Sequence, residues 1–228
     1  MMKINLLTVC TEAYPLVYAE KLIKRLCKLS HHDITPYCMT DRPEQVNGWA
    51  NPIIADPDSR GWWHKVNLFD PNMPSGWNLY LDIDIVVLNE FDEELEWTIS
   101  KNPSIACVAD AINWMGVKFN SSLMVFETGS QESIHKSYSD KKSKLQTRPG
   151  GDQVWTGPQL SNVMYINDEY PNLKKNLKFD LALATDGANI TLPSTISGDI
   201  KMIDCSGRPK PHELMGISYI RDAWGEVS

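Results

Sequence analysis

The strongest strand signal in this chain is Leu79-Tyr80-Leu81-Asp82-Ile83-Asp84-Ile85-Val86-Val87-Leu88, where every residue except the two aspartates is apolar. A short apolar run of this kind is typical of a buried β-strand. Side chains two residues apart in an extended strand point to the same face of the sheet. We therefore expect Asp82 and Asp84 to point the same way from one continuous strand.

The first forty residues predict a strand, a helix and a second strand. The segments from Ile4 to Cys10 and from Ile34 to Met39 are apolar runs of strand length. Between them, from Tyr14 to Leu29, apolar residues recur at steps of three and four, as an amphipathic helix requires. This order predicts an α/β fold in which a mixed, mainly parallel sheet is flanked by helices.

The elements further along the chain are shorter. We expect a loop over residues 41–61, which are rich in Asp, Asn, Pro and Gly, and an ordered helical segment over 62–69. The polar stretch over 132–148 is expected to be an exposed helix or a mobile loop. Further strands are expected at residues 105–108, 122–126, 163–166, 181–184 and 200–203.

Charge and composition exclude several classes of protein. The 22 Lys and Arg residues face 29 Asp and Glu residues, for a net charge of −7, and form no basic stripe, so we expect no nucleic-acid partner. No apolar run approaches the roughly 20 residues that span a bilayer, and no signal-peptide pattern is present. The five cysteines are widely spaced without a CxxC pair, which is typical of a reducing compartment. We therefore expect a cytoplasmic protein without a transmembrane segment.

Asp82 and Asp84 indicate a metal site. Two carboxylates this close repel each other and lose hydration in an apolar strand, and a divalent cation removes both costs. Oxygen ligands suit Mg²⁺ or Mn²⁺, which keep free positions for phosphate oxygens. In the alternative interpretation the strand ends near Asp82 and both aspartates cap a loop, a common role of this residue type. The apolar residues after Asp84 favour a buried pair.

Five short motifs occur in a fixed order along the chain. They are residues 61–69 (GWWHKVNLF), 79–87 (LYLDIDIVV), 119–124 (FNSSLM), 151–153 (GDQ) and 207–211 (GRPKP). In this order they resemble the motifs of GT-A fold glycosyltransferases, especially the retaining enzymes of glycosyltransferase family 8 and related bacterial and phage sequences. The resemblance implies a Rossmann-like GT-A sheet in a single domain over 1–228. Residues 1–90 would be its nucleotide-binding half, and residues 91–228 its acceptor-side half with the closing motif.

The resemblance also implies an activity and the residues that serve it. The expected enzyme is a hexosyltransferase-like glycosyltransferase that moves a sugar from a nucleotide-sugar, with UDP as the expected nucleotide, to a hydroxyl group of a glycan or other acceptor, with retention. Asp82 and Asp84 are expected to hold Mn²⁺ or Mg²⁺. Positions around the donor are matched by Thr8, Val9, Lys65, Ile83, Asn120, Gly207 and Lys210, and catalytic positions by Asp110, Asp152 and Gln153.

Three residues depart from the family pattern, and one of them is His212, which replaces the usual tryptophan after the closing motif. Relatives place a metal-binding histidine three residues before the closing glycine, where this chain has Asp204, and Ser122 stands where glycine is usual. Because aspartate also coordinates Mg²⁺ or Mn²⁺, Asp204 is the expected third ligand, with His212 as a second candidate. The departures keep open a non-catalytic sugar-nucleotide or glycan-binding protein of the same fold. A metal-dependent nucleotidyltransferase or phosphatase is the other alternative, since paired aspartates also serve phosphoryl transfer.

Overall fold

The structure is a computed structural model and describes residues 1–11, 14–186 and 189–225. Its strands are β1 (Lys3–Val9), β2 (Asp33–Thr40), β3 (Asn51–Ile54), β4 (Trp77–Leu81), β5 (Ile85–Val87), β6 (Ile105–Ala109), β7 (Phe119–Glu127), β8 (Val163–Tyr165), β9 (Lys174–Asn176), β10 (Ala184–Asp186), β11 (Asn189–Thr191) and β12 (Met202–Asp204). Its α-helices are α1 (Val17–Leu29), α2 (Asp92–Ser100), α3 (Glu132–Ser139), α4 (Lys142–Leu145), α5 (Gly151–Thr156) and α6 (Ser218–Gly225). Short 3-10 helices lie at Pro43–Gln45, Gly61–Phe69, Trp114–Gly116, Gly157–Gln159, Ile166–Asp168 and Pro211–Leu214, and a π-helical turn lies at Leu177–Leu181.

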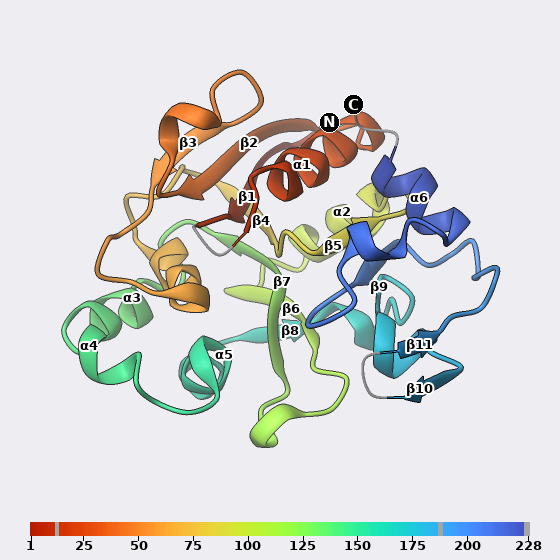
Figure 1. Cartoon of the computed structure of the whole chain (residues 1–228). Helices are drawn as coiled ribbons and strands as arrows, with labels where there is room; N and C mark the ends of the chain where they lie inside the picture. The colour runs from red at the N-terminus through yellow and green to blue at the C-terminus, as the bar shows by residue number, and fades with distance from the viewer. Residues whose placement is uncertain (12–13, 187–188, 226–228) are drawn as a thin grey trace.

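A seven-stranded sheet with the order β3-β2-β1-β4-β7-β6-β8 forms the centre of the fold (Figure 1). Strands β3, β2, β1 and β4 are parallel to one another. Strand β7 runs antiparallel to both of its neighbours, β4 and β6, and β8 is parallel to β6. The expected α/β fold with a mixed, mainly parallel sheet is therefore confirmed, as are its first two strands and the helix between them.

Alternate residues of the central strands serve two cores on opposite faces of the sheet, as the two-residue period of a strand requires. Leu6 and Leu79 pack in one core with buried residues of α1 and α2. Their neighbours Leu7 and Tyr80 pack in a second core with the 3-10 helix Gly61–Phe69 and with α3. Helices therefore cover both faces of the central sheet, and α3, α4 and α5 gather on the side away from α1 and α6 (Figure 1).

A second sheet, with the order β5-β12-β9, continues from the central one. Strand β5 pairs antiparallel with β12, and β12 runs parallel to β9. A third apolar core joins this sheet to helices α1 and α6, with Val86 and Ile203 among its fully buried members. Strands β10 and β11 form a separate antiparallel pair.

Two segments differ from the sequence-based expectation. Residues 41–61, expected to be a loop, contain β3, which pairs with β2 at the edge of the sheet. The sequence does not reveal β3 because it is short, mostly exposed and contains Pro52, a residue type confined to edge strands. The stretch 132–148 is helical, as α3 and α4, but Ile134 and Tyr138 are buried, so its inner face belongs to the core.

Most of the remaining expected elements are present. Residues 62–69 are helical, and four expected strands correspond to β6, β7, β8 and β12 with shifted ends. The strand expected over 181–184 is wrong, because Leu181 belongs to the π-helical turn that Asn176 caps and only Ala184 lies in a strand, β10. All five cysteines are free, and all except Cys27 are buried. Within the described residues, none of the helices has both the length and the apolar character that crossing a membrane requires.

Candidate active site

A cavity of about 550 Å³ opens at one edge of the central sheet. Asp82 follows the carboxyl end of β4 and Asp110 follows that of β6, two strands that run in the same direction because β7 is antiparallel to both. Asn120 and Ser121 lie near the beginning of β7, which starts at the same edge. All four residues line the cavity. It therefore lies at the carboxyl edge of parallel strands, where open α/β sheets bind their ligands.

Asp82 and Asp84 lie in a turn between two strands. β4 ends at Leu81 and β5 begins at Ile85, whose N–H donates to the carbonyl oxygen of Asp82 at 3.1 Å. Because β4 and β5 belong to different sheets, the expectation of one continuous strand is wrong, and the strand does end near Asp82. The apolar run hides this break because β5 is as buried as β4.

Asp84 is only 9% exposed, and its surroundings raise the pKa of its carboxyl group. Burial raises the pKa of its carboxyl group, and the nearby charge of Asp82 raises it further. Lys210 Nζ lies 2.6 Å from Asp84 Oδ2 and only partly offsets both effects. For Lys210, the attraction of Asp84 outweighs burial and raises the pKa of the ammonium group. The turn therefore gathers more negative charge than the paired lysine neutralises.

Asp82 is held by Lys65 and Tyr80. Lys65 Nζ lies 2.8 Å from the Asp82 carboxylate and 3.3 Å from Ser121 Oγ. Burial alone lowers the pKa of Lys65, but the charges of Asp82 and Asp152 outweigh it, so the pKa lies above its ordinary value. The Tyr80 hydroxyl donates to Asp82 Oδ1 at 2.5 Å. These contacts fix the orientation of the Asp82 carboxylate at the cavity.

Asp152 lies in the first turn of α5 and lines the cavity. It is 6% exposed, and burial raises its pKa although the charge of Lys65 opposes the effect. The preceding residue, Gly151, has a φ of 68°, and a Cβ added there would lie 2.4 Å from Trp62 Nε1. Only glycine fits both the backbone conformation and this close approach of the indole ring. The contact holds the first turn of α5 against the cavity.

A hydrogen-bond network joins Asp110, Asn120 and Gln153 in the cavity wall. Asp110 Oδ2 accepts from Gln153 Nε2 at 2.8 Å and from Asn120 Nδ2 at 3.2 Å. Gln153 Oε1 accepts from the N–H of Ser121 at 3.3 Å. The other oxygen of Asp110 accepts from two backbone N–H groups of the loop that follows β6. The network aligns polar side chains from β6, β7 and α5 along one wall.

Lys174, on β9, belongs to the site and was not predicted from the sequence. Its Nζ lies 2.6 Å from Asp204 Oδ2 and 2.7 Å from Ser122 Oγ, and it lines the same cavity. Burial raises the pKa of Asp204, but the charge of Lys174 outweighs it, so the pKa lies below its ordinary value. Lys174 stands in a polar stretch with no periodic pattern, so only the pairing of β9 with β12 brings it to Asp204.

The expected site residues divide between the cavity wall and its surroundings. Those outside the lining of the cavity are Thr8, Val9, Ile83, Asp84, Gly207 and Lys210, whereas Lys65, Asp82, Asp110, Asn120, Asp152, Gln153 and Asp204 line it. Thr8 is 1% exposed. Gly207 has a φ of 78°, and a Cβ there would lie 2.9 Å from Lys178 Nζ. His212, the second candidate for a third metal ligand, is exposed and hydrogen-bonds to the Tyr18 hydroxyl.

Known structures share this architecture. No family model and no curated protein matches the chain. A structure of the galactosyltransferase LgtC with donor and acceptor sugar analogues is 14% identical over 97% of this chain and 95% of that chain, with a TM-score of 0.66. The glycosyltransferase GlyE of Streptococcus pneumoniae is 16% identical over 98% of this chain and 61% of that chain, also with a TM-score of 0.66. The chain has the GT-A glycosyltransferase fold.

Mouse xyloside xylosyltransferase 1 is a more distant match, with 13% identity over 90% of this chain and 98% of that chain and a TM-score of 0.52. These identities establish the fold alone, and membership of family 8 stays a prediction.

The donor atoms of this GT-A site suit a divalent cation at two of the three expected ligands. Asp82 and Asp84 offer carboxylate oxygens, the ligands that Mg²⁺ and Mn²⁺ prefer, and their mutual repulsion would be relieved by a cation. Asp204 differs because its side chain is 2% exposed, compared with 21% for Asp82 and 12% for Asp84. Oδ1 accepts from the N–H of Ser206 at 2.9 Å, and Oδ2 is paired with Lys174. Within the described residues, Asp82, Asp84 and Asp204 do not bring one carboxylate oxygen each to within 4.8 Å of the other two.

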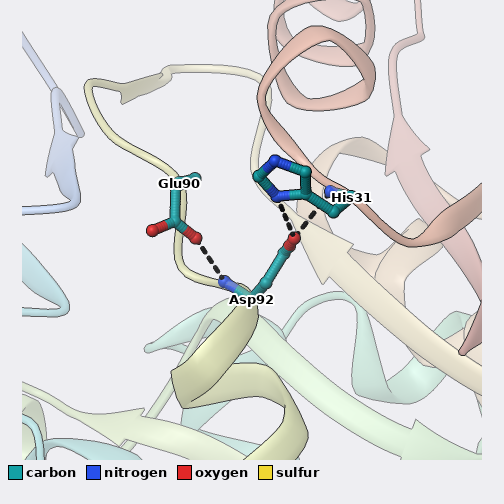
Figure 2. Close-up of side chains that lie close together, drawn as sticks. All are labelled: His31, Glu90 and Asp92. Carbon is teal, nitrogen blue, oxygen red and sulfur yellow. Dashed lines mark hydrogen bonds and ion pairs between the residues drawn. The ribbon is translucent and has the colours of Figure 1, made fainter. Parts of the chain in front are cut away.

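In the described part of the chain, one group of three does meet that distance criterion, namely His31, Glu90 and Asp92 (Figure 2). The N–H of His31 donates to Asp92 Oδ2 at 2.6 Å, and the N–H of Asp92 donates to Glu90 Oε2 at 3.2 Å. Ser30 Oγ also donates to Asp92, at 2.6 Å. Carboxylates at a helix start commonly accept such bonds. These hydrogen bonds join the end of α1 to the beginning of α2, so the three residues have a structural role.

Proposed function

We propose that this protein transfers a glycosyl group from a nucleotide-sugar to a hydroxyl group of an acceptor. One observation supports the proposal most: lysine–aspartate pairs and a network of polar side chains meet at a single cavity in a GT-A fold. Transfer from a nucleotide-sugar releases a diphosphate, whose growing negative charge must be stabilised. The sugar itself needs hydrogen-bond donors and acceptors in pairs. The cavity offers both.

The charges around the cavity support a divalent cation as cofactor. Three lysines and five aspartates line it, a formal excess of two negative charges; they are Lys65, Lys174, Lys175, Asp82, Asp110, Asp152, Asp180 and Asp204. We assign Mn²⁺ or Mg²⁺ to Asp82 and Asp84. When bound, such an ion supplies Lewis-acid stabilisation of the leaving diphosphate. Lys210, paired with Asp84, adds a positive charge for the same phosphates.

The nucleoside is assigned to the carboxyl end of β1. Strand β1 lies beside β4 and runs parallel to it, so Thr8 and Val9 reach the same edge of the sheet as Asp82. The diphosphate would then lie between the nucleoside and the cavity. UDP is the expected nucleotide on the family resemblance.

The donor sugar is assigned to the wall formed by Asp110, Asn120 and Gln153. Their amide and carboxylate groups are aligned by one another, so they are held in place before a ligand binds. Asp152 carries the buried negative charge suited to stabilising positive charge at the anomeric carbon, with Gln153 beside it. Retention is proposed with the donor phosphate as the base for the incoming hydroxyl group.

The acceptor is proposed to be a glycan, because aromatic side chains surround the cavity. Trp62, Trp114 and Phe179 all line it, and their exposed fractions are 60%, 52% and 57%. Exposed apolar side chains that gather around one cavity mark a ligand-binding surface, whereas singly scattered ones are ordinary. Aromatic faces offer an apolar surface to the C–H groups of a sugar ring, while its hydroxyl groups stay in water.

The test is metal-dependent nucleotide release from a panel of UDP-, GDP- and CDP-sugars, measured with Mn²⁺ and with EDTA. We expect release from one nucleotide class only, and only with metal. Asp84→Asn should lower the rate by about 10²-fold, because it removes charge from the metal and diphosphate site. Asp58→Asn, which changes an exposed aspartate in the loop before the 3-10 helix Gly61–Phe69, is the matched control and should leave the rate unchanged.

The outcomes separate the competing functions. Nucleotide binding without release, for every sugar and acceptor, would support a non-catalytic binding protein. Release of pyrophosphate or inorganic phosphate in place of a nucleoside diphosphate would support a nucleotidyltransferase or phosphatase. Equal release rates from wild type and Asp84→Asn would contradict the assignment of the metal site.

A further inference from the structure

The ammonium group of Lys174 contacts three side-chain oxygens and has no free N–H group. Besides Asp204 Oδ2 at 2.6 Å and Ser122 Oγ at 2.7 Å, its Nζ lies 3.4 Å from Asn120 Oδ1. An ammonium group has three N–H donors, so these contacts use all of them. The side chain of Lys174 is 6% exposed. Lys174 is therefore a fixed internal cation with no N–H group left for a substrate.

Asp204 is equally enclosed. Its Oδ2 accepts from Lys174 Nζ and, at 3.4 Å, from Ser122 Oγ, and its Oδ1 accepts from the N–H of Ser206. Its side chain is 2% exposed, compared with 21% for Asp82 and 12% for Asp84. A metal ion that used Asp204 would have to displace an ammonium group from a buried carboxylate. Such a displacement is costly because it leaves Lys174 charged and unpaired in a buried position.

Ser122 and Asp204 are also two of the three positions at which the sequence departs from the family pattern, the third being His212. They lie 82 residues apart in the chain, yet both contact the same ammonium group. One lysine on β9 thus accounts for both departures. An aspartate without Lys174 would be a buried, unpaired charge at this position, and a glycine at 122 would remove one of the three contacts of the ammonium group.

We infer that Lys174 is the permanent counter-ion of Asp204 and keeps this aspartate out of the metal site. The inference rests on the proposed function and deepens it. The metal would then be held by two protein carboxylates, Asp82 and Asp84, with positions left for phosphate oxygens of the donor. Lys174 acts as a positioning residue, because it also fixes Asn120 and Ser122 on β7.

The test is direct Mn²⁺ binding without nucleotide, measured by the paramagnetic relaxation of water protons. We expect Asp204→Asn to change the Mn²⁺ dissociation constant by less than about twofold, and Asp84→Asn to raise it by about tenfold or more, the usual effect of losing a group that supports a metal. Lys174→Met should lower the constant about tenfold, because it frees the Asp204 carboxylate as a third ligand. Lys174→Arg, which keeps the charge, should resemble wild type, and so should Lys136→Met, the same change at an exposed lysine of α3 that does not line the cavity.

Each outcome bears on the inference. If Asp204→Asn weakens Mn²⁺ binding as much as Asp84→Asn does, Asp204 is a metal ligand and the inference is overturned, while the proposed metal site stands. If neither aspartate affects binding, or wild type binds no Mn²⁺, the metal site itself fails and the inference fails with it. Should Lys174→Met not fold, the isosteric Asp204→Asn still decides between these outcomes, because it removes the charge without a change in shape.

Discussion

Each aspartate that the sequence assigns to the metal is held by a lysine from a distant part of the chain. The pairs are Lys65 with Asp82, Lys210 with Asp84 and Lys174 with Asp204, separated by 17, 126 and 30 residues. Buried ion pairs of this kind add little net stability, but the loss of one partner is costly. The pairs therefore serve to fix the carboxylates in position, and the side chains of Asp82 and Asp84 stay more exposed than that of Asp204.

Asp152→Asn is expected to stabilise the folded protein at neutral pH. Burial is the main reason why the folded-state pKa of Asp152 lies above the ordinary value of 3.8, so folding disfavours the charged form. This cost is present above the folded-state pKa and shrinks as the pH falls through it. It is absent below the unfolded-state pKa of about 4, where both states are protonated. Urea unfolding should show a gain of about 1 kcal/mol at pH 7 and none near pH 3.

The control for this prediction is Asp58→Asn, which also removes one negative charge but from an exposed side chain. An equal gain in both variants at pH 7 would mean that net charge, and not the burial of Asp152, determines the effect. A loss of stability in Asp152→Asn would contradict the direction of the pKa shift.

At the scale of elements, the site depends on two sheets that meet at the turn of Asp82 and Asp84. The central sheet supplies the carboxyl ends of β4 and β6 and the beginning of β7. The second sheet supplies Lys174 from β9 and Asp204 from β12, which lie on neighbouring parallel strands. The site therefore forms only when the strands have paired within both sheets.

Gly151→Ala is expected to disturb the site through an element, α5. The alanine would adopt a φ of 68°, and its Cβ would meet the indole of Trp62 at 2.4 Å. We expect a loss of about 1–2 kcal/mol in the free energy of unfolding from the backbone conformation alone. Chemical denaturation measures the loss. Gly198→Ala is the control, because a Cβ at Gly198 meets nothing within 4 Å, and an equal loss there would contradict the account.

The central sheet except its edge strand β3 could be predicted, because its other strands and the helix α1 carry apolar patterns. The turn at Asp82 could not be predicted from the sequence. The strands on either side of it, β4 and β5, are both buried, so their residues form one apolar run although they belong to different sheets. Asn120 and Gln153 were proposed from motifs and Asp110 from the family resemblance, and the structure brings them into one network. Lys174 was missed because its role comes from the pairing of β9 with β12, which no local pattern encodes.

At the scale of the whole molecule, the cavity combines a negatively charged wall with an aromatic rim. The rim comes from three separate segments, which contribute Trp62, Trp114 and Phe179. The protein as a whole carries a net charge of −7. A free nucleotide diphosphate is repelled by such a surface, so we expect the protein to bind it together with a divalent cation.

Trp114→Ala is expected to weaken binding of a glycan acceptor without affecting the donor site. Loss of one stacking surface should raise the KM for the acceptor about threefold to tenfold. Nucleotide release in the absence of acceptor should stay within about twofold, because the exposed side chain carries no charge and offers no ligand to the metal. Ile54→Ala is the control, since Ile54 is 77% exposed on β3 and does not line the cavity. An unchanged acceptor KM in Trp114→Ala would contradict the role of the rim.

The central claim is that Asp82 and Asp84 hold a divalent cation for the diphosphate of a nucleotide. The most direct test is calorimetric titration of UDP into wild type and Asp84→Asn, each with Mn²⁺ and with EDTA. We predict that wild type binds UDP at least about a hundredfold more tightly with Mn²⁺, and that Asp84→Asn loses this gain. Equal UDP affinity with Mn²⁺ and with EDTA in wild type, or a full Mn²⁺-dependent gain in Asp84→Asn, would contradict the account.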